Sequence, residues 1–161
     1  LYLDTVLPAG SYSMYTPVGT RSPLHSTALG KALLAFRPDS EIKAVLKNYS
    51  FRPLTPATIL TEEAMYEAIE ETRRNGYAVD REESTIGVRC VASVIVNSLG
   101  YPEAAVSVST KGDRLKDEEA VRQIGALVCA ATRAISHELG FPLGPDPASW
   151  YEQVIRHRGH G

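Results

Sequence analysis

A Gly-Lys pair, Gly30-Lys31, stands in the stretch LHSTALGKALLAF and is the kind of dipeptide that binds phosphate in nucleotide-binding loops. Such a loop needs a glycine five positions before Gly30 and a serine or threonine directly after the lysine. These two positions hold His25 and Ala32. The pattern fails twice, so we do not expect a nucleotide here. Lys31 is as compatible with a surface position as with a ligand contact.

Nucleophilic chemistry is conceivable at Cys90, with His25 as its base. A cysteine within a strand is more often a small buried apolar residue. The motifs G-x-S-x-G, G-x-G-x-x-G and C-x-x-C do not occur, and HELGF at His137 lacks the second histidine of a zinc-protease helix. His157 and His160 could bind a metal, but histidines near a chain end usually do not. We expect no metal and no cofactor, and an enzyme that uses Cys90 is the alternative.

Two hydroxyls, Ser107 and Ser109, alternate with valines in AAVSVST and therefore share one face of an expected strand. A sheet with one solvated face would explain them. If helices cover both faces, however, the hydroxyls lie inside and need hydrogen-bond partners. A ligand can supply those partners, so the two serines are candidates for a binding site.

The expected helix that begins near Ser26 offers a second polar feature. The first amides of a helix have no intrahelical partner, and the helix dipole favours a negative group there. The backbone N–H groups of Ala28 and Leu29 could therefore hold a small carboxylate. Asp80 ends the strand GYAVD and can point inward, whereas Arg81, Glu82 and Glu83 are expected in a solvated loop.

The elements that position these residues follow from hydrophobic periodicity and from turn and cap signals. Ser26 or Thr27 is the expected N-cap of the first helix, Thr61 begins a later one, and Asn75-Gly76 ends it. A long helix ends at Gly140, and the segment after it is expected to be loosely held. Together they predict an α+β fold with a mostly antiparallel sheet. The predicted strands are 1–8, 12–19, 76–80, 87–97 and 104–110, the earlier helices are 26–36, 39–49 and 61–75, and the buried stripe of the long helix is Val121, Ile124, Val128, Ile135 and Leu139.

Composition narrows the class of protein. The 161 residues suit one domain with a sizeable core, and a formal net charge of −2 with a pI near 6.1 is unlike a nucleic-acid-binding surface. The apolar runs are too short to span a bilayer, so no membrane partner is expected. Two cysteines are too few for a disulfide framework, which favours the cytoplasm. The chain begins without Met and is expected to be a fragment of something longer.

Three stretches together resemble a known family. LHSTALGKALLAF, followed by GYAVDREESTIGVRCVASVIVN and AAVSVST, is similar to the effector-binding domain of IclR-type bacterial transcriptional regulators, over about residues 1–140. The resemblance implies a GAF-like α+β domain at 1–140 and a C-terminal tail at 141–161. It also implies that an N-terminal winged helix-turn-helix is absent from this chain. Operator DNA would then be bound only through that missing domain.

The family's pocket residues can be placed on this sequence. The resemblance implies a small organic acid or similar metabolite as effector. The positions it implies at the effector are Ala28, Leu29, Asp80, Cys90, Ser107 and Ser109, with Ser11 and Met14 upstream. Val94 replaces a proline that is frequent in relatives, and Asn97 replaces an aspartate, so the effector's identity stays open. TKGD stands where relatives often have Gly-Pro.

These observations favour a sensor over a catalyst. We expect a ligand-sensing domain that forms a homodimer or tetramer and modulates DNA binding by an attached domain, with no chemistry of its own. The first alternative is a GAF-like enzyme acting on small organic acids, with Cys90 as nucleophile. The second is a structural dimerisation module, which would bind no ligand.

Overall fold

Three helices, three strands and a long helix follow one another from residue 28 to residue 138, in the order that the periodicity predicts. The computed structural model describes residues 1–7, 16–144 and 150–158. The elements are α1 (Ala28–Ala35), α2 (Asp39–Leu46), α3 (Glu62–Asn75), β1 (Ala78–Arg81), β2 (Val88–Val96), β3 (Pro102–Lys111), the 3₁₀ turn η1 (Gly112–Leu115), α4 (Glu118–Glu138) and α5 (Trp150–Arg158). The predicted α+β class is confirmed.

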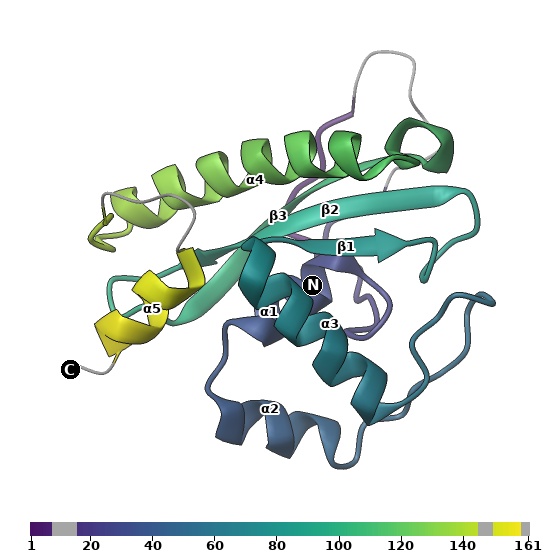
Figure 1. Ribbon diagram of the computed structural model, residues 1–161, viewed down its shortest axis with the longest axis horizontal. Helices are drawn as coiled ribbons and strands as arrows, with labels where there is room; N and C mark the ends of the chain where they lie inside the picture. Colours follow the sequence, from purple (N-terminus) through teal and green to yellow (C-terminus); the bar gives the residue numbers. More distant parts are fainter. Residues whose placement is uncertain (8–15, 145–149, 159–161) are drawn as a thin grey trace.

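The three strands form one antiparallel sheet in the order β1-β2-β3. Side chains alternate between its two faces. Val79 and Val91 pack against α4, whereas Ala78 and Ala92 pack against Ala28 of α1. Figure 1 shows the resulting layers, with α4 along one face of the sheet and α1, α2 and α3 on the other.

Local signals fixed the helix ends. Thr27 and Thr61 are N-caps whose hydroxyls accept hydrogen bonds from the amides of Gly30 and Ala64. Each cap satisfies one of the free amides at a helix start. Gly76 ends α3 with φ at 78°, a left-handed conformation that glycine adopts without a Cβ clash. These predicted boundaries are confirmed.

The buried stripe of α4 differs from the predicted one towards its C-terminal end. Val121 and Val128 are buried as expected, but Ile135 and Leu139 are 40% and 49% exposed. Their predicted places are taken by Thr132 and Ser136, among other residues. The Ser136 hydroxyl accepts a hydrogen bond from the Val96 amide at 3.0 Å, and the Thr132 hydroxyl donates to Ser93 Oγ at 3.1 Å. Hydrogen bonds to the sheet, which hydrophobic periodicity does not register, set the rotation of the helix here.

The strand predicted at 1–8 is wrong over its described part, because residues 1–7 form no strand. Tyr2 does exchange backbone hydrogen bonds with Gly19 and Thr20, both at 2.9 Å. Leu1, Leu3 and Val6 remain 70–89% exposed, so this pairing has no core to pack on, and a lone two-strand pair is marginal. The strand predicted at 12–19 lies mostly outside the described residues, and 16–19 are not in a strand.

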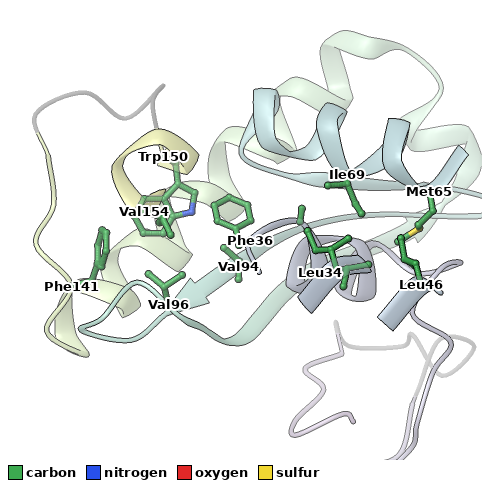
Figure 2. Close-up of a cluster of buried hydrophobic side chains, with 12 residues drawn as sticks. Leu34, Phe36, Leu46, Met65, Ile69, Val94, Val96, Phe141, Trp150 and Val154 are labelled. Atoms are coloured by element: carbon green, nitrogen blue, oxygen red, sulfur yellow. The ribbon is translucent and has the colours of Figure 1, made fainter. Parts of the chain in front are cut away.

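The C-terminal segment is not loosely held where it is described. Phe141, Trp150 and Val154 are at most 2% exposed and pack with Phe36 and the end of β2. Figure 2 shows these side chains converging with Val94 and Val96. The indole of Trp150 is edge-on to Phe141 at 5.4 Å, and the Arg133 guanidinium lies 5.4 Å from the Trp150 ring centroid. Aromatic burial of this extent holds α5 on the domain.

Candidate functional site

Four of the residues singled out from the sequence lie together on the face of the sheet that α1 covers. In the strand register Asp80 pairs with Cys90, and Cys90 pairs with Ser109, so these three form one row across the sheet. Ser107 lies two residues before Ser109 and pairs with Ala92. Paired residues in neighbouring strands point to the same face. Backbone pairing alone therefore places a carboxylate, a thiol and two hydroxyls side by side.

Asp80 is the buried member of the row, at 2% exposure. Its Oδ1 accepts hydrogen bonds from the amides of Glu83 and Ser84, at 2.7 and 3.4 Å. Among the described residues, its second oxygen, Oδ2, accepts none. Burial raises the pKa of Asp80 to about 6, because the charged form loses its hydration. A hydrogen-bond donor placed at Oδ2 would stabilise the ionised form.

Burial decreases along the row, from Asp80 through Cys90 to Ser109. Cys90 is half-buried and accepts a hydrogen bond from Ser109 Oγ at 3.1 Å. Burial raises the pKa of the Cys90 thiol to about 11. Ser107 is half-buried and makes no side-chain hydrogen bond within the described part of the chain, whereas Ser109 is exposed. The conditional expectation that both serines lie inside is therefore wrong for Ser109, because within the described part of the chain no strand lies beyond β3 and Ser109 is left exposed.

His25 does not form the conceivable pair with Cys90. Its Nε2 lies 3.0 Å from the carbonyl oxygen of Arg52, and its Nδ1 lies 3.0 Å from the Tyr49 hydroxyl. That hydroxyl in turn accepts from the Leu24 amide. Both ring nitrogens are thus used, and Nε2, which faces a carbonyl oxygen, is the donor in its contact. The histidine anchors the segment before α1 to residues 49–52.

The first turn of α1 offers free backbone donors beside this row. The Thr27 hydroxyl takes the Gly30 amide, while the amides of Ala28 and Leu29 have no partner among the described residues. Ala28 and Leu29 pack in the same small cluster as Cys90 and Ala92. The hydroxyl of Ser26, completely buried, also lacks a partner in the described structure. Several unsatisfied polar groups therefore lie at or directly before the helix start.

Gly30 and Lys31 have structural roles in place of phosphate binding. A Cβ on Gly30 would come within 2.3 Å of the Leu24 carbonyl oxygen, so only glycine lets the chain cross the helix start here. Lys31 is 2% exposed, and its ammonium forms an ion pair with Glu83 at 2.6 Å. Glu83 is itself buried, and its predicted position in a solvated loop is wrong.

Sequence reasoning missed this ion pair, although one signal for it was available. Lys31 occupies the same helical stripe as Ala28 and Ala35, at spacings of three and four residues, and that stripe faces the sheet. A lysine within an apolar stripe needs a buried partner. Nothing in the local sequence marks Glu83 as that partner, because the two residues are 52 positions apart.

Other candidate features lie apart from the row. A pocket of about 300 Å³ is lined by Pro142, Gly144 and three residues of α5. It holds no cluster of the predicted site residues. His157 Nε2 lies 2.7 Å from the Ser98 carbonyl oxygen, while His160, Ser11 and Met14 lie outside the described residues. Within the described ranges no three His, Cys, Asp or Glu side chains are grouped to hold a metal, and no helix is long and apolar enough to cross a bilayer.

Comparison with known proteins shows which family this chain belongs to. The family model for the C-terminal domain of the bacterial transcriptional regulator IclR matches residues 1–137. The chain belongs to this family. The matched residues include the whole row Asp80–Cys90–Ser109, all of α1 and most of α4. Helix α5 lies beyond the match.

Individual relatives of this IclR domain are named as regulators. The HTH-type transcriptional regulator XynR of Escherichia coli (strain K12) is 41% identical over 142 residues, which are 88% of this chain and 56% of XynR. The crystal structure of the Thermotoga maritima IclR superposes with a TM-score of 0.81 at 37% identity, covering 86% of this chain and 56% of that one. The chain thus spans little more than half the length of these relatives.

One solved relative contains a ligand. The inducer-binding domain of a double mutant of the transcription factor PobR from Acinetobacter, in complex with 3-hydroxybenzoic acid, superposes with a TM-score of 0.68 at 26% identity. The match covers 85% of this chain and 77% of that domain. The bound molecule is a small acid that carries a hydroxyl group.

Proposed function

We propose that this chain is the effector-sensing part of a bacterial transcriptional regulator. A small organic acid binds between the start of α1 and the row Asp80–Cys90–Ser109. Its binding shifts the affinity of an attached helix-turn-helix domain for operator DNA, as a coupling free energy between two sites. The observation that carries the proposal is that Ala28 and Leu29, whose amides are free, share a cluster with Cys90, the strand partner of Asp80, whose Oδ2 accepts no hydrogen bond among the described residues.

The two ends of this site select different chemical groups. The amides of Ala28 and Leu29, at the positive end of α1, favour a carboxylate. Asp80 disfavours a second anion beside it, because neighbouring like charges oppose joint ionisation. A hydroxyl on the acid satisfies Oδ2, and Ser107 and Ser109 complete the polar ring. The effector is therefore a hydroxylated organic acid, a class to which the 3-hydroxybenzoic acid bound to the PobR double mutant also belongs.

Catalysis by Cys90 is the weaker alternative. A thiol whose pKa is raised to about 11 is almost wholly protonated at neutral pH, and the thiolate is the nucleophile. His25, the candidate base, is bonded to Tyr49 and Arg52. Cys90 acts as a polarisable wall of the site, with no turnover.

The rest of the assignment extends to the whole regulator. The proposal keeps Met14 among the effector-binding residues, as the family resemblance implies. The domain self-associates as a homodimer or tetramer, and the regulator works in the cytoplasm with operator DNA as its macromolecular partner. No metal, cofactor or membrane takes part.

The proposal is tested with matched pairs of acids, titrated by calorimetry and by thermal shift. The pairs are acetate with glycolate, propionate with lactate, and benzoate with 3-hydroxybenzoate. The hydroxylated acid of at least one pair binds about tenfold more tightly, the loss that an unpaired buried acceptor causes. The methyl ester of that acid loses binding. Equal affinity of acid and ester, or no binding by any of the six acids, contradicts the proposal.

A further inference from the structure

Lys31 uses its whole ammonium group inside the protein. Its Nζ donates to the Val79 carbonyl oxygen at 2.6 Å and to both carboxylate oxygens of Glu83, also at 2.6 Å. An ammonium has three N–H groups, and all are taken. Lys31 therefore has no donor left for a ligand, although it lies one turn from the start of α1.

Glu83 is the residue through which this ion pair reaches Asp80. Its backbone N–H donates to Asp80 Oδ1 at 2.7 Å, the shorter of the two bonds that orient that carboxylate. Its side chain, besides holding Lys31, accepts from the Arg81 amide at 3.3 Å. Moving Glu83 would move the donor that fixes Asp80.

The loop that carries Glu83 needs to be held. Glu82 has φ at 67°, in the left-handed region that residues with a Cβ seldom adopt. Such a conformation persists only where the surroundings fix it. The Thr55 hydroxyl donates to the Glu82 carbonyl oxygen at 2.7 Å, and the Thr58 hydroxyl donates to that of Glu83 at 2.8 Å. Lys31 holds the same loop through the side chain of Glu83, whereas the two threonines hold its backbone.

Stability alone is a poor explanation for a buried ion pair. Removing two charges from water costs about as much as their attraction returns, and apolar replacements of similar volume are often as stable. We propose that Lys31 and Glu83 are positioning residues of the effector site. Their ion pair fixes the loop after β1 so that Asp80 Oδ1 is held by backbone amides and Oδ2 is left to accept from the hydroxyl of the effector. This inference rests on the proposed function for the identity of the ligand, and on the geometry alone for the position of Asp80.

The charges around Asp80 make this arrangement selective. Glu83 and Lys31 are the charged groups whose fields reach the carboxylate, and Cys90 is the titratable neighbour across the strand. Because Glu83 already neutralises Lys31, the Lys31 ammonium does not act as a free cation towards Asp80. A donor on the ligand is then favoured over a second carboxylate at Oδ2.

The first test uses the ligand-free protein. Hydrogen exchange of single amides, followed by NMR, reports whether the Glu83 and Ser84 amides stay bonded to Asp80. In Lys31→Met we expect their protection to fall at least tenfold, while amides of β2 and β3 keep theirs. Glu119→Gln breaks an exposed pair with Arg122, with both side chains 61% exposed, and serves as the control that changes neither. Unchanged protection in Lys31→Met overturns the inference.

A second variant separates positioning from stability, because Lys31→Met leaves Glu83 as a buried unpaired charge. The double variant Lys31→Met/Glu83→Leu replaces both charges by apolar groups of similar volume. We expect it to unfold at a temperature within a few degrees of wild type, yet to lose the protection at positions 83 and 84. Protection that is retained in this folded double variant overturns the inference.

The third test measures selectivity with the same double variant. For lactate and propionate, and for 3-hydroxybenzoate and benzoate, we expect the roughly tenfold preference for the hydroxylated acid to shrink to within about twofold, with the plain acid unaffected. A fall of equal size for both acids would show a merely structural role. If wild type binds none of these acids while the exchange test succeeds, the proposed effector class fails and the positioning of Asp80 by Lys31 and Glu83 stands.

Discussion

The face of the sheet that α1 covers has two ends with opposite character. At one end, Asp80, Cys90 and Ser109 form a polar row that runs from a buried carboxylate to an exposed hydroxyl. At the other end, Val94 and Val96 have no exposed surface, and they pack in one cluster with aromatic side chains such as Phe36 and Trp150 (Figure 2). Strand β2 runs through both ends, with Cys90 in the polar row and Val94 and Val96 a few residues further on. Along β2 the residue types therefore change from the polar row of the proposed site to the apolar core that holds α5 on the domain.

Helix α1 belongs to both ends. It begins with the free amides of Ala28 and Leu29 and ends at Phe36, which packs edge-on against Tyr151 at a centroid distance of 5.3 Å. Arg158 of α5 also donates to the Phe36 carbonyl oxygen. The aromatic end thus fixes the helix whose other end carries the free amides of Ala28 and Leu29. Changes at the two ends should accordingly separate into losses of stability and losses of binding.

The largest effect is expected at the aromatic end. Phe36→Ala removes a completely buried ring and should lower the free energy of unfolding by about 3–5 kcal/mol, from lost burial and the cavity left behind. Urea denaturation measures this, with Leu54→Ala, at a position 47% exposed, as the control that changes little. In the surviving folded protein the preference between lactate and propionate should not change. A loss below about 1 kcal/mol would contradict the role given to this end.

The second prediction concerns the pH dependence that Asp80 gives to the polar end. The folded protein keeps this proton up to about pH 6, whereas the unfolded carboxyl releases it near 3.8. Between these values the folded state binds more protons, so stability falls as pH rises. Relative to Asp80→Asn, the free energy of unfolding of wild type should drop by roughly 2–3 kcal/mol between pH 3.5 and 7. Urea titrations across this range measure it, and parallel curves for the two proteins would refute it.

The third prediction concerns Ser109, on the exposed side of the row. Ser109→Val removes a donor and an acceptor and should weaken binding of the preferred hydroxylated acid by about tenfold to a hundredfold. The melting temperature should hardly change, because valine suits a strand. Thr110→Val on the opposite face of the same strand is the matched control for calorimetry. Equal affinities of Ser109→Val and wild type would remove Ser109 from the site.

The smallest effect is expected at the helix caps. Thr27→Ala and Thr61→Ala each remove one capping hydroxyl and should each cost about 1 kcal/mol of stability. Only Thr27→Ala should also weaken acid binding, by about two- to threefold, because only that helix start lies at the polar end. Denaturation and calorimetry on the pair check this. Identical binding by both variants would disconnect the start of α1 from the ligand.

Much of the fold was predictable because its determinants are local. Thr27, Thr61 and Gly76 mark helix ends through bonds that span three or four residues, and alternation placed Ser107 and Ser109 on one face. The row Asp80–Cys90–Ser109 needed the register between three strands, which periodicity does not fix. The resemblance to the IclR family, not the spacing, joined those residues before the strands were known to pair.

What could not be predicted depends on long-range contacts. Nothing near Glu83 in sequence announces that Lys31 will meet it, so a charged loop was the better expectation. The same holds for α5, where Trp150 gains a core only because Phe36 and Phe141 arrive from elsewhere. The exposure of Ser109 depends on which strands and helices lie around β3, and among the described residues no strand lies beyond it.

The crossing of Leu24 over Gly30 has a practical consequence for altering what this domain recognises. Any side chain at position 30 meets the Leu24 carbonyl oxygen, so the backbone path that presents the two free amides is not open to gradual change. Positions such as Leu29 and Ser107 carry ordinary side chains on regular elements and can be exchanged without rerouting the chain. A library that seeks a new effector should therefore randomise those side chains and leave the glycine alone, so that each member keeps the same backbone path at the start of α1.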